Sequence, residues 1–531
     1  MRKIISVMLI MLVMASALLS SGCGKETGRT IRYAYGAEPQ SLDPRKNMEY
    51  QSSLIAFQAF ECLTNLSENG AAEPAGAESW EISADSLKYI FHLRKNAKWS
   101  NGEAVTAADY EYAWKTALAP SFASPGVAMF YFVKNAEAYN MGKDGVAENS
   151  VGVRAVDDFT LEVETAHPVS YLPALVAAPI FSPVNKKLVS QNDKWCNDTK
   201  SYIGNGPFKL VNYERQNKLE FVKNENYWDA GKVKSDKLVF YIVDNAATKL
   251  KMYENNQVDM TDSPPPSEIE RLTKAGSARI LPHMATFAYL FNTTRAPFDN
   301  IQVRMAFALA INRALITGKV LKGGQRPAMA FVSPGMPDVA KGSDFRATGG
   351  DLFKDNDIAA AKALLVSAGY PDGKGLPEIK LLFGNNEMSK SMAEIAQEMW
   401  KNNLNVNVKL ESMESKALTH KKEQLDYQLV SGGWGGDYPD PNTYMEIFQT
   451  NTLNTTGYRN DKYNFMVKVA NNDTDTVKRY SQMHAAEKIL IDDMPFLPLY
   501  FSSFVLVAKP ELQGLKLNAL KYMYFKEAYI K

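Results

Sequence analysis

Strand-like and helix-like segments alternate without interruption between residues 357 and 441, and this alternation is what most constrains the fold. The hydrophobic pattern predicts strands at 379–383, 405–410 and 426–430, with helices at 357–369, 392–401 and 414–423. Strands separated by helices pair in parallel, so the sequence indicates an α/β fold. Ligands of such sheets bind beyond the carboxyl ends of the strands, which draws attention to the segment that follows the last strand.

That segment, residues 431–441, reads SGGWGGDYPDP. Glycines allow a second backbone to approach closely, so an extended peptide could pair with this segment as an added strand. Trp434 would offer it an apolar wall, and Asp437 could accept a charge-assisted hydrogen bond of about 1.5–3 kcal/mol from an amine. The alternative is a glycine-rich turn in which Trp434 lies in the core and Asp437 caps local backbone.

Upstream, a second region has strong local signals. Residues 88–94 alternate as a strand, and the Asn-Gly pair at 101–102 predicts a turn. Thr106 and Asp109 form a capping box that predicts the start of a helix. Two further strands are expected between 151 and 164.

The N-terminus predicts export. Arg2 and Lys3 precede an apolar run that ends at Leu19, and small residues then lead to Cys23. This pattern predicts a signal peptide at 1–22, lipidation of Cys23 and a tether at 23–30. It resembles a bacterial lipobox, with one departure, because Ser20 stands where leucine is usual. The alternative is a plain secretory signal with a chance cysteine.

Size, charge and cysteines bound the remaining possibilities. A chain of 531 residues exceeds the size of one hydrophobic core, so two or three domains are expected. Its net charge of +1 shows no basic bias, which argues against nucleic acid as a partner. Beyond the leader no apolar run is long enough to predict a membrane span. Cys62 and Cys196 are expected to be unreactive free thiols, with a disulfide as the alternative.

Nothing in the sequence favours catalysis. The five histidines form no His-Glu-x-x-His motif, and neither a nucleophile elbow nor a phosphate loop is present. His484 and Glu487 have a usable metal-ligand spacing, but an amphipathic helix surface explains them better. We therefore expect no enzyme, no catalytic residue, no metal and no cofactor, with a secreted peptidase as the rival hypothesis.

Short motifs in a fixed order carry a resemblance to a known family. In chain order they are EPQSLDP (38–44), FECL (60–63), AESW (77–80), FHLR (91–94), KWSNG (98–102), ADYEYAW (108–114), NGPF (205–208), NENYW (224–228), PFDN (297–300), Arg304, AGY (368–370) and GWGGDYPDP (433–441). Together they resemble the oligopeptide-binding proteins of ABC importers, the peptide/nickel class of solute-binding proteins. The resemblance covers nearly the whole chain after the leader.

The resemblance implies a two-lobed, three-domain fold like that of periplasmic binding proteins, with the ligand cleft between the lobes. Domain I would combine 31–60, 186–285 and 502–531. Domain II would span 61–185, and domain III would span 286–501.

The resemblance also implies site residues. Asp437 would receive the α-amino group of a peptide, and the backbone at Gly433, Trp434 and Gly435 would pair with it. A second strand contact is expected at Asn47, Met48 and Glu49. Two departures stand out: Ser431 replaces an arginine that can bind the peptide carboxylate, and Gly435 with Ala285 replaces a family disulfide.

These expectations define a function. The protein would be a monomeric, lipid-anchored receptor on the outer face of the cytoplasmic membrane, which captures oligopeptides and delivers them to ABC permease subunits. Receptors of the same fold for nickel chelates, haem or oligosaccharides remain the alternative, because fold alone does not name a ligand. The sequence also does not separate uptake from signalling.

Overall fold

The computed structural model describes residues 29–143, 145–450, 452 and 454–531. The predicted signal peptide, Cys23 and most of the predicted tether lie outside the described residues. The tether prediction was one residue too long, because Thr30 already belongs to strand β1, Thr30–Tyr35. No helix in the described part of the chain is long and apolar enough to cross a bilayer.

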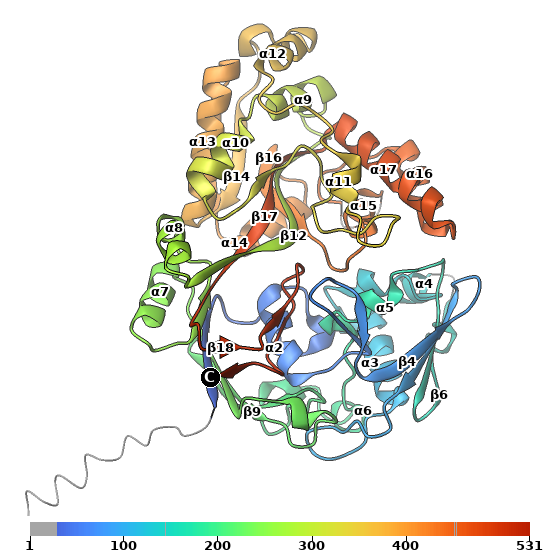
Figure 1. Ribbon diagram of the computed structural model, residues 1–531. Helices are drawn as coiled ribbons and strands as arrows, with labels where there is room; N and C mark the ends of the chain where they lie inside the picture. The colour runs from blue at the N-terminus through green and yellow to red at the C-terminus, as the bar shows by residue number, and fades with distance from the viewer. Residues whose placement is uncertain (1–28, 144, 451, 453) are drawn as a thin grey trace, which may run out of the picture.

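Figure 1 shows two lobes that share one large mixed sheet. The strand order is β15-β14-β16-β12-β17-β11-β1-β10-β9-β8, and β13 pairs with β17. The bounds of its other strands are β8 Phe208–Glu214, β9 Lys218–Lys223, β10 Lys237–Ile242, β11 Met260–Asp262, β12 Ala278–Phe291, β13 Arg326–Pro327, β14 Ile379–Gly384, β15 Val408–Met413, β16 Leu429–Gly435 and β17 Phe496–Ala508.

Strands β12 and β17 connect the lobes. They have 14 and 13 residues, far more than the other strands, and they pair antiparallel from the lower lobe into the upper one (Figure 1). Their register shifts between Pro282 and Thr286, which leaves a short stretch of β12 without its β17 partners. This interruption of the ladder lies between the lobes, where the cleft described below is located.

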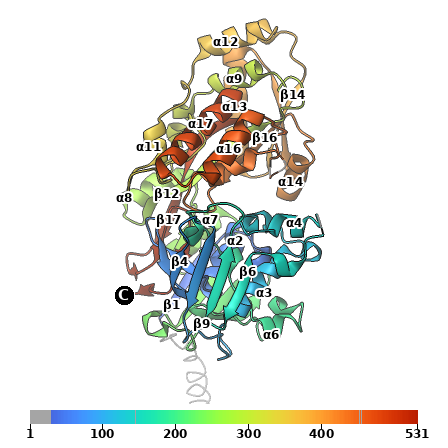
Figure 2. The ribbon, with the colours of Figure 1, turned by 90° about the vertical axis from the view of Figure 1, so that its right-hand side faces the viewer.

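The lower lobe carries the opposite half of the large sheet and a separate four-stranded antiparallel sheet, visible from the side in Figure 2. The order of the small sheet is β4-β5-β7-β6. Its elements and the neighbouring helices are β4 Ala77–Ile82, β5 Lys88–Leu93, β6 Val153–Asp157, β7 Thr160–Glu164, α2 Tyr50–Ala59 and α3 Ala107–Leu118. Strand β1 lies in parallel between β10 and β11, an observation that supports a discontinuous domain I, whose boundaries stay a prediction.

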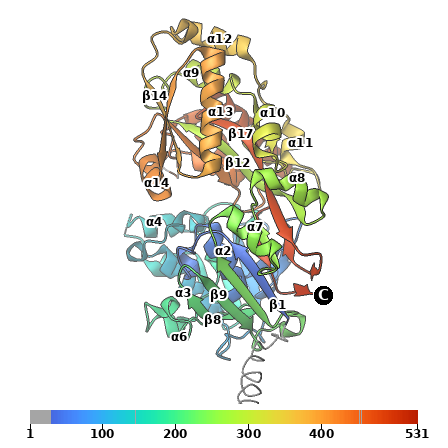
Figure 3. The same ribbon diagram turned by 90° about the vertical axis from the view of Figure 1, so that its left-hand side faces the viewer.

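The upper lobe covers its part of the sheet with helices, and α13 runs along one side in Figure 3. The larger helices here are α9 Ile301–Leu309, α12 Ile358–Ser367, α13 Glu387–Leu404, α14 Ser415–Glu423, α16 Asp461–Asn472 and α17 Thr476–Asp493. Helices α7, Ala246–Glu254, and α8, Pro266–Lys274, lie beside the connecting strands in the same view.

Several predicted elements are confirmed. The capping box of Thr106 and Asp109 begins α3, and Asp357 caps α12 through the backbone N–H of Ala360. Strands β14 and β15 are parallel, as are β14 and β16.

Two of the predicted strands had wrong boundaries, for physical reasons. The predicted strand at 405–410 begins only at Val408, because Asn405 adopts a left-handed conformation and ends the longer helix α13. The predicted strand at 426–430 begins only at Leu429 and continues to Gly435, because β12 supplies an antiparallel partner over these residues. The glycine-rich segment is therefore half strand and half loop.

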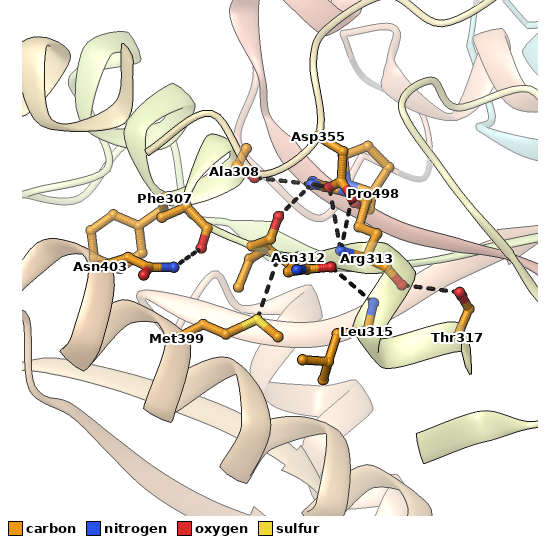
Figure 4. Close-up of polar contacts among 12 residues, drawn as sticks. Phe307, Ala308, Asn312, Arg313, Leu315, Thr317, Asp355, Met399, Asn403 and Pro498 are labelled. Carbon is orange, nitrogen blue, oxygen red and sulfur yellow. Dashed lines mark hydrogen bonds and ion pairs between the residues drawn. The ribbon is translucent and has the colours of Figure 1, made fainter. Parts of the chain in front are cut away.

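The buried guanidinium of Arg313 links three segments of the upper lobe by hydrogen bonds (Figure 4). Arg313 donates from Nε to the carbonyl of Pro498 at 2.7 Å and from Nη1 to the carbonyl of Ala308 at 3.1 Å and to Asp355 at 2.9 Å. It thereby links strand β17, the end of α9 and the segment before α12. A charge buried in this way is tolerated only because its hydrogen-bond partners compensate for lost hydration.

We expect Arg313→Met to lower the free energy of unfolding by about 3 kcal/mol, because it leaves Asp355 and two carbonyls without their buried donor. Urea unfolding followed by circular dichroism measures this change. The exposed Arg326 provides the control, and Arg326→Met should change stability by less than about 0.5 kcal/mol. Equal stability of both variants would contradict a structural role for the network.

Candidate ligand site

A cleft of about 650 Å³ lies between the lobes, within the size range of small-ligand sites. The lower lobe contributes the start of α2 and the loop before it, and the upper lobe contributes β12, β16 and β17. All seven residues predicted to bind ligand line this single cleft: Asn47, Met48, Glu49, Gly433, Trp434, Gly435 and Asp437. The structure therefore brings together two segments nearly 400 positions apart in the sequence.

Strand β16 has an unpaired edge along the cleft. On one side it pairs with β12 from Leu429 to Gly435. On the other side its partner β14 pairs only with Leu429 and Val430, so among the described strands none pairs with the Ser431–Gly435 edge. Unpaired strand edges are templates for an added strand, so this edge can accept an extended guest.

The glycines of this segment serve different purposes. Gly433 has φ of +147°, and a side chain there would collide with the backbone carbonyl of Thr286 on β12. Gly436 would collide with Met336. Gly435 alone has room, because a Cβ added there would meet only the methyl group of Ala285, at 3.8 Å. Gly433 is thus needed for the protein's own packing, whereas side chains at Gly432 and Gly436 would collide only with the flexible side chains of Leu290 and Met336. Gly435 fits the interpretation that a guest backbone approaches there.

The backbone of Asp437 is fixed while its carboxylate is not. Its N–H donates to Thr443 Oγ1 at 3.1 Å, and its carbonyl accepts from the hydroxyl of Tyr522 at 2.9 Å. Within the described residues the carboxylate has no hydrogen-bond or ion-pair partner, so it does not cap local backbone. Burial raises the pKa of Asp437 to about 7. An acid held in this way favours a cationic partner.

Trp434 fits parts of both interpretations made from the sequence, a core residue and a wall of the ligand site. Its ring is half-buried against the core and also lines the cleft. Its indole N–H donates to Thr443 Oγ1 at 3.3 Å, the same hydroxyl that receives the N–H of Asp437. The ring is therefore held in one orientation as a wall of the cleft.

The lower-lobe segment offers backbone groups rather than side chains. The Glu49 carboxylate caps α2 by accepting from the N–H groups of Gln51 and Ser52, so it is occupied. Asn47 is buried, and its Oδ1 accepts from Ser53 Oγ. In the described structure the N–H and C=O of Met48 form no hydrogen bond, which leaves them free to pair with a guest.

Other residues of the cleft had no signal in the sequence. His283, Ser502, Lys521 and Tyr522 line it although they belong to no motif quoted above. They come from β12, β17 and a hairpin near the C-terminus, so only the tertiary fold brings them to Asp437. Lys521 was not foreseen, and it places a cation in the same cleft as the Asp437 acid.

The departures from the family pattern are consistent with the structure. Ala285 and Gly435 are direct partners across β12 and β16, so the two positions do face each other but carry no thiols. Ser431 lies on the same strand and lines the cleft. Cys62 and Cys196 are both free, as expected, and burial raises the pKa of Cys62 to about 12, which makes it unreactive.

His484 and Glu487 do not form a metal site. Glu487 is buried and accepts from the backbone N–H of Phe331 and from Arg346, while His484 contacts Asp338. The interpretation of this pair as a helix surface was wrong for Glu487, because local spacing does not reveal its distant partners. No cluster of three potential metal ligands occurs among the described residues.

The lobes also touch through protein atoms. The rings of Tyr171 and Tyr438 stack with centroids 4.6 Å apart and an interplanar angle of 2°. Asn442 Nδ2 donates to the Tyr171 hydroxyl at 3.1 Å. Tyr171 precedes a helix of the lower lobe and Tyr438 follows Asp437, so this contact joins the two lobes next to Asp437.

Comparison with known proteins identifies the family. The family model described as "Bacterial extracellular solute-binding proteins, family 5 Middle" matches residues 71–456. The chain belongs to this family. Such proteins are the non-catalytic binding components of ABC transporters and act outside the cytoplasm, which confirms the predicted recognition, the absence of enzymatic activity and the extracytoplasmic location.

Individual relatives cover nearly the whole chain. The dipeptide-binding protein DppE of Bacillus subtilis is 36% identical over 95% of this chain and 92% of its own length. The oligopeptide-binding protein OppA of the same organism is 35% identical over 100% of this chain and 99% of its own. The crystal structure of Haemophilus influenzae OppA in complex with RPPGFSPFR superposes with a TM-score of 0.83 at 31% identity, covering 95% and 99% of the two chains. These matches confirm the predicted α/β fold.

The raised pKa of Asp437 predicts a pH-dependent stability difference. The folded protein holds this proton up to a pH near 7, whereas the unfolded chain releases it near 3.8, so the group destabilises the folded state increasingly as pH rises through this window. Asp437→Asn should therefore melt at a higher temperature than the unmodified protein at pH 8. At pH 4 the two should melt alike, as scanning calorimetry can measure. Identical differences at both pH values would contradict the assigned pKa.

Proposed function

We propose that this protein is a peptide receptor of an ABC importer, which captures oligopeptides in the interlobe cleft and delivers them to membrane permease subunits. The single observation that carries the proposal is the unpaired Ser431–Gly435 edge of β16, which ends beside the unpartnered Asp437 carboxylate. Peptides have the matching features, a hydrogen-bonding backbone and a cationic amino end. The similarity to DppE and to both OppA proteins supports the same ligand class.

Binding proceeds by strand addition. The peptide backbone pairs with Gly433, Trp434 and Gly435 on one side and with the segment Asn47 to Glu49 on the other, where Met48 has free backbone groups. Backbone pairing does not read side chains, so we expect tolerance of many peptide sequences. Because the two segments belong to different lobes, a bound peptide favours the closed arrangement.

Rival functions make different demands on the same cleft. A receptor for nickel chelates, haem or oligosaccharides needs no free strand edge, and a secreted peptidase would turn peptides over. Titration calorimetry with mixed peptides and these other ligands, followed by mass analysis of the recovered peptides, separates the three. Binding without cleavage supports the receptor.

We expect Asp437→Asn to weaken binding of free-amine peptides at least about tenfold, equivalent to ~1.4 kcal/mol, because the charge-assisted hydrogen bond is lost. Calorimetry with a tripeptide and its N-acetylated form measures this. Affinity of the unmodified protein should also fall as pH drops below 7, since protonation of Asp437 removes the anion.

The acetylated peptide is the control in this experiment. It should bind the unmodified protein and the Asn variant with similar affinity. If the unmodified protein binds acetylated and free peptides equally well, Asp437 does not receive the amino group.

We further propose that Cys23 is lipidated and that the protein functions as a monomer at the outer face of the cytoplasmic membrane. The support is the leader composition and the small residues before Cys23. Cys23→Ser should release the mature protein into the soluble extracytoplasmic fraction, as immunoblotting of separated fractions will show. Cys62→Ser is the matched control and should leave the protein with the membrane. Continued membrane attachment of the Cys23→Ser protein would exclude the anchor.

A further inference from the structure

An uncompensated cation lies in the cleft. Lys521 lines it and is half-buried, and within the described residues its ammonium forms no ion pair and no hydrogen bond. Its Nζ lies over the rings of Tyr50 and Phe504, 3.9 and 4.6 Å from their centroids. Cation–π contacts of this kind offset only part of the hydration that burial removes, so the site favours an anion.

The surrounding residues hold Lys521 in place and leave its charge available. It occupies the tip of the hairpin formed by β19, Lys516–Leu517, and β20, Met523–Tyr524. Asn518 fixes that tip by accepting from the N–H groups of Leu520 and Tyr522. Lys521 itself has φ of +63°, so its backbone conformation is set by the turn.

The neighbouring charges do not neutralise Lys521. The acid whose charge acts on Lys521 is Asp262, and its carboxylate is already bonded to Lys249 Nζ at 2.5 Å. His283 also lines the cleft, and burial together with the charge of Lys521 lowers its pKa to about 3, so the imidazole is neutral. His283 bonds Ser502 at 3.2 Å, which places two neutral polar groups beside the cation.

We propose that Lys521 is a carboxylate subsite of the cleft and makes the receptor prefer acidic or free-acid peptides. This inference rests on the proposed function. Asp437 would hold the amino end of the ligand, and Lys521 would hold a carboxylate. Both side chains line the cleft, and in the described structure no ion pair or hydrogen bond joins them, so each charge is available to a guest.

The register of β12 and β16 places His283, the neighbour of Lys521 in the cleft, at the end of the cleft near Asp437. Gly435 pairs with Ala285, and His283 lies two residues further along β12, on the side of Asp437 rather than of Ser431. The carboxylate therefore comes from an acidic side chain near the amino end of the peptide, or from the C-terminus of a very short peptide. The chemistry is the same in both cases, and the source is decided by experiment.

The test uses calorimetry on the full mature protein with matched peptides. Trialanine is compared with its C-terminal amide, and tripeptide amides that carry Glu at the first, second or third position are compared with their Gln counterparts. We expect at least one carboxylate form to bind about tenfold more tightly than its neutral partner. The position that shows this preference identifies the source of the carboxylate.

Variants assign the preference to the side chain. Lys521→Met should reduce it to less than about twofold, Lys521→Arg should retain it, and the exposed control Lys516→Met should not change it. In all three the preference for a free amine should persist, because Asp437 is intact. Peptide binding without any carboxylate preference, or a preference that survives in Lys521→Met, would overturn this inference alone. No peptide binding at all would overturn the proposed function and the inference with it.

Discussion

The close approach of two backbones, β12 and β16, is the constraint on which the site depends. At Gly433 any side chain would meet the carbonyl of Thr286, so only glycine lets the strands pair through to Gly435. This pairing provides hydrogen-bond partners for one edge of β16, and the strand ends in the cleft. The other edge loses its partner after Val430 because β14 diverges. The protein therefore uses one edge of this strand for its own fold, and in the described structure the other edge stays unpaired from Ser431 to Gly435.

Among the described residues, two charged side chains of the cleft are unpaired, like the strand edge beside them. Several buried ions elsewhere in the described structure are matched by an opposite charge, as Arg313 is by Asp355 and Lys249 by Asp262. Asp437 and Lys521 have no such partner in the described structure. Burial raises the pKa of Asp437 and lowers the pKa of Lys521, and both shifts favour the neutral form of the group. Leaving two unpaired ions there costs stability that a structural role would not explain. Binding sites commonly retain such costs, because the ligand supplies the missing counter-charge.

How much of the fold and of the site could be predicted depended on how far apart in the sequence the interacting residues lie. Capping and alternation are local, so the start of α3 at Thr106 and strand β5 were predicted correctly. The extension of β16 to Gly435 was missed because its partner β12 lies some 150 residues away, and period-two alternation is absent among glycines. The family motifs indicated Asp437 and the segment at Asn47. Lys521 carries no local signal, since only the folded C-terminal hairpin brings it to the cleft.

Closure of the lobes must be driven mainly by the ligand. The protein's own contacts across the cleft include the stacked pair Tyr171 and Tyr438, worth about 0.5–1.5 kcal/mol, and the hydrogen bond from Asn442 to the Tyr171 hydroxyl, worth a similar amount. Converting a mostly open population into a mostly closed one takes about 5.5 kcal/mol. Backbone pairing to both lobes can supply the difference, because the open form offers a peptide only one of its two pairing segments. In the proposed mechanism the receptor would therefore close fully only when loaded, and a permease could distinguish loaded from empty protein.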